Sequence, residues 1–157
     1  MVLLQFYHSE DFAELAYDLD ENQSMFTSSV ENALHRIKER NDGKAFPITI
    51  FLDDKKVGFF VLDFGNDKLP LSENQKCVLL RSLSINPDFQ GKGIGKASML
   101  KIEAFVRENF PDCNEVVLAV NEKNTLAFEL YLKTGYLYEG KIIEGRVGPQ
   151  FVMFKKL

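Results

Sequence analysis

The sequence predicts a single domain of mixed α/β class. Segments rich in β-branched and aromatic residues alternate with segments whose apolar residues recur at helical spacing, in the order β-α-α-β-β-β-α-β-α-β-β. The chain has 157 residues, of which 45% are hydrophobic and 14 are Phe. A chain of this length and composition can bury one hydrophobic core, so we expect one domain over residues 1–157.

The N-terminal half is expected to supply three strands and two helices. Ser9 can cap the first helix, whose first turn carries acids where the helix dipole favours them. Asn41-Asp42-Gly43 ends the second helix, and Asp53-Asp54 is the turn of a hairpin. The expected strands are residues 2–7, 46–52 and 56–64, and the expected helices begin near residue 10 and cover residues 28–40.

The C-terminal half begins with a nearly continuous apolar run, Cys77 to Ile85, which is typical of a central strand. A helix is expected from Ile94 to Asn109, and another begins after Asn124 as its cap and ends at Gly135 in a left-handed conformation. Further strands are expected at residues 115–120, 136–143 and 151–154, with Gly145, Gly148 and Pro149 between the last two.

A glycine-rich turn joins the predicted central strand to the helix that follows it, with the sequence Gln90-Gly91-Lys92-Gly93-Ile94-Gly95-Lys96. Glycines let the backbone approach a phosphate closely, and the first N–H groups of a helix have no partner within the helix. Lys92 and Lys96 add positive charge. We therefore expect this turn to bind a phosphorylated cofactor, the alternative being a tight turn without a ligand.

Two common phosphate loops do not fit this turn. A Walker A loop requires a Gly five residues before Gly95 and a Ser or Thr after Lys96, but these positions hold Gln90 and Ala97. The dinucleotide fingerprint requires a third Gly where Lys96 stands.

The spacing Gln90-x-x-Gly93-x-Gly95 resembles the acetyl-CoA loop of the GNAT superfamily of N-acetyltransferases. The preceding Leu83-Ser84-Ile85 looks like the end of the strand before that loop. The stretch from Asn124 through Ala127, Leu130 and Tyr131 to Gly135-Tyr136 is similar to the second signature of the family. The resemblance runs from about Cys77 to the C-terminus, and the overall pattern is similar to small bacterial-type polyamine acetyltransferases.

The resemblance implies a GNAT fold, with a central, mostly antiparallel twisted sheet of about six or seven strands and about four flanking helices. It implies acetyl-CoA as co-substrate and no metal. The pyrophosphate would contact the turn and the pantetheine arm would pair with the strand before it. The implied cofactor-binding residues are Leu83, Ser84, Ile85, Gln90, Gly91, Lys92, Gly93, Ile94, Gly95, Lys96, Asn124, Ala127 and Tyr131.

The implied reaction is attack of a primary amine on the thioester in a ternary complex. Tyr131 matches the tyrosine that protonates the leaving thiolate, and its unperturbed pKa of about 10 keeps it protonated at neutral pH. No acid lies in the stretch Leu80–Ser84 to act as the base. Glu73, Glu122 and Glu139 are alternatives, as is loss of the proton through ordered water. Arg81 either pairs with an acid on a neighbouring strand or orients an acidic acceptor.

The acceptor is expected to be a small cationic amine such as a polyamine. The first 35 residues contain no Lys or Arg but seven acids, which could form a wall that attracts cations: Glu10, Asp11, Glu14, Asp18, Asp20, Glu21 and Glu31. Helix-dipole and solvated-surface roles explain several of these acids equally well. Two other functions stay open, a protein or peptide N-acetyltransferase and a non-catalytic acyl-CoA-binding sensor.

Composition excludes several other classes. A net charge of −4 argues against general nucleic-acid binding, and two Cys and two His lack metal-ligand spacing. No apolar run reaches the ~20 residues that span a membrane, and the N-terminus lacks the basic start of a signal peptide. We therefore expect a cytoplasmic protein, and the family and the aromatic C-terminal strands are compatible with a homodimer.

Overall fold

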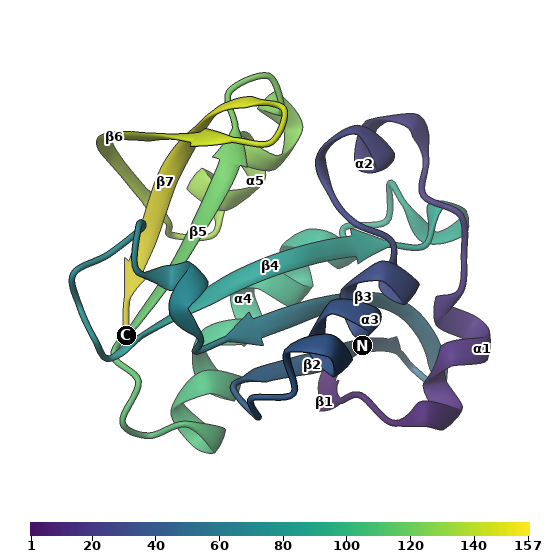
Figure 1. Cartoon of the computed structure of the whole chain (residues 1–157). Helices are drawn as coiled ribbons and strands as arrows, with labels where there is room; N and C mark the ends of the chain where they lie inside the picture. The colour runs from purple at the N-terminus through teal and green to yellow at the C-terminus, as the bar shows by residue number, and fades with distance from the viewer.

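The computed structural model describes all 157 residues, and they form a mixed α/β fold. Its sheet has seven strands in the order β1-β2-β3-β4-β5-β7-β6 (Figure 1). Neighbouring strands pair antiparallel, except that β4 and β5 pair in parallel. The predicted fold class and the mostly antiparallel sheet are therefore confirmed.

The strands are β1 (Val2–Phe6), β2 (Ala45–Leu52), β3 (Lys55–Asp63), β4 (Cys77–Ile85), β5 (Glu115–Asn121), β6 (Leu137–Gly145) and β7 (Gly148–Lys156). The helices are α1 (Phe12–Leu15), α2 (Glu21–Phe26), α3 (Val30–Arg40), α4 (Ile94–Asn109) and α5 (Thr125–Lys133). The bounds of β4 and α4 are those that the sequence predicts.

Helices cover both faces of the sheet, and β3 shows how the sequence produces this. Side chains alternate along a strand, and every residue of β3 from Val57 to Asp63 is buried. Phe59 and Val61 pack in a cluster with residues of α1 and α3. Phe60 and Leu62 pack on the opposite face in a cluster with α4, which lies behind the sheet in Figure 1.

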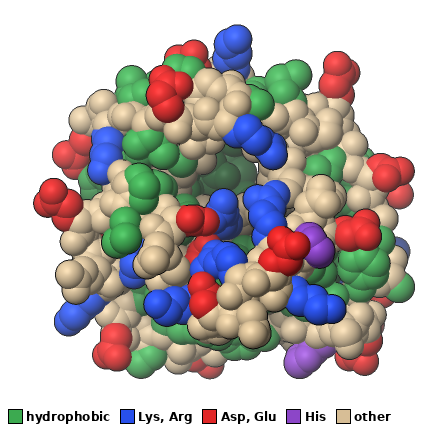
Figure 2. All heavy atoms as spheres, viewed as in Figure 1, with side chains coloured by type: hydrophobic (Ala, Val, Ile, Leu, Met, Phe, Trp, Pro, Cys, Tyr) green, Lys and Arg blue, Asp and Glu red, His purple; other side chains and the backbone are tan.

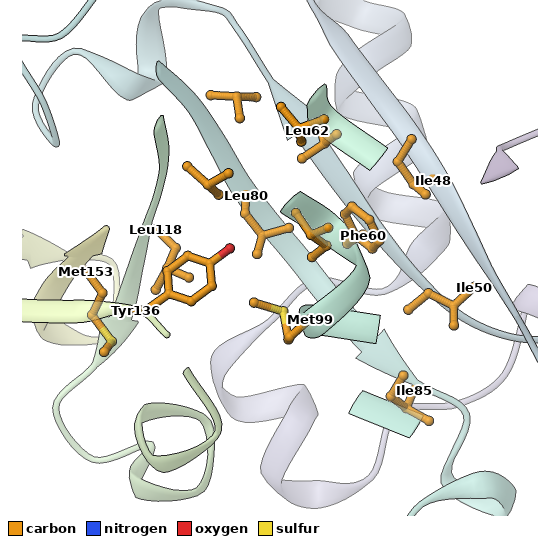
Figure 3. Close-up of a cluster of buried hydrophobic side chains, with 14 of the residues drawn as sticks. Ile48, Ile50, Phe60, Leu62, Leu80, Ile85, Met99, Leu118, Tyr136 and Met153 are labelled. Carbon is orange, nitrogen blue, oxygen red and sulfur yellow. The ribbon is translucent and has the colours of Figure 1, made fainter. Parts of the chain in front are cut away.

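The larger of these clusters is the main core, and it extends across the sheet from β1 to β7. Figure 3 shows Ile48, Phe60, Leu80, Met99 and Met153 within it, all buried. Each fully buried apolar side chain of this size contributes roughly 1.5–3 kcal/mol. This core holds β4 and α4 together and so positions the turn between them.

The N-terminal helices differ from the prediction. The first helix ends at Leu15 and follows a 3-10 turn over Ser9–Asp11, so Ser9 does not cap it. Asp11 precedes the helix without a side-chain cap bond, and its carboxylate accepts the His8 N–H at 3.0 Å at the start of the 3-10 turn. The helix α2 was missed because none of its residues is buried, so it has no apolar stripe. Asp20, whose carboxylate accepts the Gln23 N–H at 2.8 Å, was the available signal for its start.

The final hairpin is longer than predicted. Its turn is Arg146–Val147, and Gly148 and Pro149 belong to β7 rather than to the connection. The predicted strand 151–154 was too short because it followed the apolar residues alone. The first residues of β7, Gly148 to Gln150, are not strongly apolar, yet they pair with β6 next to the turn. None of the helices is both long and apolar enough to cross a membrane.

Candidate active site

The glycine-rich turn lies between β4 and the first turn of α4, as predicted. Gly91 and Gly93 have φ angles of 77° and 75°, a region that side chains other than glycine rarely adopt. Gly93 immediately precedes α4, and no side chain caps the first N–H groups of this helix. No atom lies within 4 Å of the position that a Cβ would take at either glycine. The backbone of the turn is therefore open to a ligand.

A cavity of about 930 Å³ lies beside this turn. It exists because β4 and β5 separate, their parallel pairing being limited to Cys77–Leu79 opposite Glu115–Val117. The cavity begins at Gly91 and Gly95 and extends to α3 and the β6–β7 turn. Figure 2 shows a hollow near the middle of this face, with Lys and Arg side chains on its rim.

The edge of β4 presents backbone groups to the cavity. Ile85 is opposite Gly58 of β3, and the adjacent bond runs from the Asn86 N–H to the Val57 carbonyl. In this arrangement the N–H and C=O of Ile85 point away from β3. Ile85 and Leu83 both line the cavity, so this edge can pair with an extended ligand.

Gln23 of α2 occupies these backbone groups, and the sequence did not single it out. Its Oε1 accepts the Ile85 N–H at 2.9 Å and its Nε2 donates to the Ile85 carbonyl at 3.0 Å. Gln90 Nε2 donates to the same carbonyl at 3.2 Å. The Gln23 carboxamide therefore pairs with β4 as an amide of an added strand would. Figure 1 shows α2 above the tip of the β4 arrow.

The helix α5 contributes another wall of the cavity. Asn124 caps this helix by accepting the Ala127 N–H at 3.4 Å, and Asn124, Ala127 and Tyr131 all line the cavity. The Tyr131 ring packs against Tyr136, with 5.9 Å between the ring centroids. Burial raises the pKa of Tyr131 to about 12. Its hydroxyl therefore stays protonated at neutral pH and can donate a proton into the cavity.

Three of the predicted cofactor-binding residues do not line the cavity, namely Ser84, Lys92 and Lys96. Ser84 is buried, and its hydroxyl lies 2.7 Å from the hydroxyl of Tyr17. Lys92 lies over the Phe89 ring, 5.4 Å from its centroid, and Lys92 and Lys96 are both exposed. The side chain of Ser84 is thus held in a buried contact with Tyr17, whereas the two lysines lie at the outer surface of the turn.

The strand β4 is irregular in its middle. Its register with β3 shifts between Phe59 and Val61, and Ser82 has a φ of 60°, which is uncommon for a residue other than glycine. Ser82 lines the cavity. Backbone strain of this kind concentrates at functional sites, and here it lies where β4 leaves β5.

Arg81 takes the first of its two predicted roles, since it pairs with an acid of the neighbouring strand. It donates to Asp63 of β3 at 3.2 Å and to Asp67 at 2.6 Å. Asp63 also accepts two bonds from Arg40, at 2.7 and 3.0 Å. Burial opposes the ionisation of Asp63, but the bonds from Arg40, the Gly65 N–H and Arg81 hold its pKa below the ordinary value. The group is therefore an ionised, buried carboxylate.

The predicted acidic wall does not form. Of the seven N-terminal acids only Asp20 lines the cavity, and its carboxylate caps α2. Asp11 is buried, accepts the Thr49 hydroxyl at 2.8 Å and lies 3.5 Å from Lys56, which also pairs with Glu14. The physical reason is that the fold turns Asp11 and Glu14 toward Thr49 and Lys56 of the β2–β3 hairpin and not toward the cavity.

None of the three suggested bases, Glu73, Glu122 and Glu139, lines the cavity. The carboxylates on its wall are those of Asp20, Asp67 and Glu144. Two arginines that the sequence did not single out, Arg36 and Arg146, line the cavity as well. They come from α3 and the β6–β7 turn, and no local sequence pattern connects them. No group of three or more His, Cys, Asp or Glu side chains is placed to hold a metal ion.

Comparison with known proteins agrees with this geometry. The model of the acetyltransferase (GNAT) family matches residues 5–136. An N-acetyltransferase of uncharacterised function from Bacillus subtilis, YbbJ, is 37% identical over 154 residues, which cover 97% of this chain and 95% of that protein. Spermine/spermidine N(1)-acetyltransferase of B. subtilis is 25% identical over 130 residues, 83% of each chain.

Solved structures show the same fold. An aminoglycoside acetyltransferase in complex with coenzyme A and kanamycin superposes with a TM-score of 0.79 at 14% identity, covering 99% of this chain and 95% of that one. The spermidine N-acetyltransferase of Vibrio cholerae, solved with CoA and spermine, gives 0.71 at 18% identity with the same coverage. The family match covers most of the chain and includes the glycine-rich turn, β4 and α5. This protein therefore belongs to the GNAT family and is an N-acetyltransferase.

Proposed function

We propose that this protein transfers the acetyl group of acetyl-CoA to a primary amine by direct attack in a ternary complex. The observation that carries the proposal is that one continuous cavity is lined by the glycine-rich turn, by Tyr131 and by the edge of β4. One space can thus hold the thioester and an amine together. The relatives solved with CoA or acetyl-CoA support the choice of donor.

The turn from Gly91 to Lys96 suits the pyrophosphate of the donor. A helix of 16 residues begins there with uncapped N–H groups, and its dipole favours negative charge at this end. The open space over Gly91 and Gly93 lets a phosphate approach the backbone closely. Lys92 and Lys96, exposed at the turn, add attraction without lining the cavity.

The pantetheine arm would pair with the edge of β4 at Leu83 and Ile85. An arm with amide groups can bond to the Ile85 N–H and C=O, which face the cavity. Because Gln23 holds these two groups at 2.9 and 3.0 Å, the proposal requires Gln23 to release them when the donor binds. Ser84 takes no part through its side chain, since its hydroxyl is bonded to Tyr17.

The chemical step needs a neutral amine and a proton for the leaving thiolate. A free alkyl amine has a pKa of about 10.4, so about one molecule in a thousand is neutral near pH 7. The amine nitrogen bonds to the thioester carbon, the C–S bond breaks, and Tyr131 protonates the sulfur. The proton of the amine leaves to water or to Glu144, a carboxylate of the cavity wall.

The polyamine acceptor expected from the sequence is supported by the relatives named for spermine and spermidine. The acidic N-terminal segment does not support it, because this segment contributes only Asp20 to the cavity. A peptide acceptor and a non-catalytic sensor are the competing functions.

The buried, free thiols of Cys77 and Cys113 are compatible with the reducing cytoplasm expected for this protein.

The test combines binding with turnover. Calorimetric titration with acetyl-CoA and with CoA is followed by measurement of thiol release in the presence of small amines and of a lysine-containing peptide. We expect acetyl-CoA binding and thiol release with a small amine. Binding without release from any amine would favour the sensor, faster release with the peptide would favour the peptide acceptor, and absence of acetyl-CoA binding would refute the proposal.

A further inference from the structure

Three arginines from distant parts of the chain line the same cavity as the glycine-rich turn. Arg36 lies on α3, Arg81 on β4 and Arg146 in the β6–β7 turn, and all three line the cavity. The charges of Arg81 and Arg146 both act on Arg36. The pKa of Arg36 is lowered by burial and by the charges of Arg81 and Arg146, with Asp67 acting in the opposite direction.

Two of these guanidinium groups have no acidic partner. Arg81 is paired with Asp63 and Asp67. Arg36 donates to the Ser28 hydroxyl at 2.6 Å and forms no ion pair, and Arg146 makes neither an ion pair nor a side-chain hydrogen bond. A guanidinium group offers a planar fork of donors that fits two oxygens of a carboxylate or phosphate. Arg36 and Arg146 therefore keep this donor capacity free at the cavity wall.

The acids on the cavity wall do not fill this role. Asp67 is bonded to Arg81 at 2.6 Å, and Asp20 accepts the Gln23 N–H at the start of α2. Glu144 is exposed on β6, two residues before Arg146, and forms no ion pair with it. Of these three acids only Asp67 acts on the pKa of Arg36. A polycation beside Arg36 and Arg146 would face two unneutralised positive charges.

We propose that Arg36 and Arg146 bind an anionic oxygen group, a carboxylate or phosphate, on the same small molecule that presents the amine. The acceptor is then a small primary amine that also carries an acid group, and not a polyamine. Its amine lies toward Tyr131 while the arginines hold its anionic end. This assignment rests on the proposed acetyl transfer and adds the chemical class of the acceptor to it.

The experiment compares amines in pairs that differ only in the acid group, using the full-length protein, acetyl-CoA and thiol release. L-Lysine with cadaverine and L-phenylalanine with phenethylamine test the carboxylate, and O-phosphoethanolamine with ethanolamine tests the phosphate. Spermidine represents the polyamines. We expect kcat/KM to be at least about tenfold higher for the acidic member of one type of pair, the gain from a charge-assisted hydrogen bond.

Variants test whether the preference for acidic amines depends on Arg36 and Arg146. Arg36→Gln and Arg146→Gln are each expected to raise the KM of the acidic acceptor by about 10- to 100-fold, as for loss of a hydrogen bond between charged groups, and to leave the KM of acetyl-CoA unchanged. Lys38→Gln is the matched control, because Lys38 is an exposed cation of α3 that does not line the cavity. It should keep the preference of the original protein.

Binding of the acidic amines to the CoA complex, measured by calorimetry, separates the possible failures. Turnover that favours cadaverine, ethanolamine or spermidine would overturn the anion site and leave the proposed acetyl transfer intact. Acidic amines that bind in an Arg36-dependent way without thiol release would support the anion site and overturn the transfer. Absence of both binding and turnover with the acidic amines would overturn the anion site.

Discussion

Tyr131 is the residue on which the proposed chemistry most depends. It lies on α5 at the wall of the cavity, and burial raises its pKa to about 12. A phenol with such a pKa holds its proton at every pH at which the protein would be assayed, and it can release the proton to a thiolate during the reaction. The alkaline side of a pH–rate profile below about pH 10 should therefore report another group, such as the amine.

Replacing Tyr131 with Phe removes this proton donor and keeps the ring. We expect kcat to fall about 100-fold, within the usual range for general acid catalysis, with little change in the Kd of acetyl-CoA. Tyr136→Phe is the matched control, because Tyr136 packs against Tyr131 but does not line the cavity. An unchanged kcat in the Tyr131→Phe protein would assign protonation of the thiolate to water.

Among the elements, α2 has the clearest link to function. This short helix has no buried residue, so core packing contributes little to its position. Its Gln23 makes two hydrogen bonds to the backbone of Ile85 at the edge of β4. In the proposed function the pantetheine arm pairs with the same edge, so α2 and the donor would compete for Ile85.

Removing the competing side chain should tighten donor binding. In Gln23→Ala the two bonds to Ile85 no longer have to break, and each is worth about 0.5–1.5 kcal/mol. We expect the Kd of acetyl-CoA, measured by calorimetry, to fall by about 5- to 100-fold, which corresponds to the loss of both bonds. Ser24→Ala is the control, since the Ser24 hydroxyl bonds only within α2, to the Glu21 carbonyl at 3.1 Å. Weaker binding in Gln23→Ala would mean that Gln23 contacts the donor and does not compete with it.

For the whole molecule, the ion pairs around Asp63 connect α3, β3 and β4 and make stability depend on pH. The side chain of Asp63 is 1% exposed and pairs with Arg40 and Arg81. Its pKa in the folded protein is lower than in the unfolded chain, where it is about 3.9. The group therefore stabilises the protein fully above about pH 4, and this contribution is lost as the pH falls toward the folded pKa.

Asp63→Asn should remove this contribution. We expect the free energy of unfolding at pH 7 to fall by about 3 kcal/mol, because Arg40 and Arg81 lose the buried acceptor that they share. Denaturant unfolding at several pH values should show a weaker dependence on pH below 4 than in the original protein. Asp42→Asn, which removes an exposed partner of Arg40, should destabilise far less. Equal losses would show that burial of Asp63 has no special effect.

The homodimer compatible with the sequence stays a prediction for the whole molecule. The strand β6 forms one edge of the sheet, and Leu137 and Ile142 on it are 54% and 53% exposed. An exposed edge with apolar side chains is a surface that a second chain can cover. Light scattering should give twice the 18.0 kDa of one chain, and Ile142→Lys should return it to a monomer. A single-chain mass for the original protein at all concentrations would contradict the prediction.

The sequence by itself determined the fold class, the family and the turn between β4 and α4. These features depend on local patterns, such as the apolar run of β4, the glycines at 91 and 93 and the Asn124 cap, which are visible within a few residues. Only the tertiary structure decided what surrounds the cavity. Arg36, Arg146 and Gln23 come from segments that no local pattern connects, and the packing of α3, the β6–β7 turn and α2 around the gap between β4 and β5 brings them together. The acidic N-terminal segment shows the same limit. Its acids are close together along the chain, but an acceptor meets only the side chains that the fold turns toward the cavity, and of these acids that is Asp20 alone.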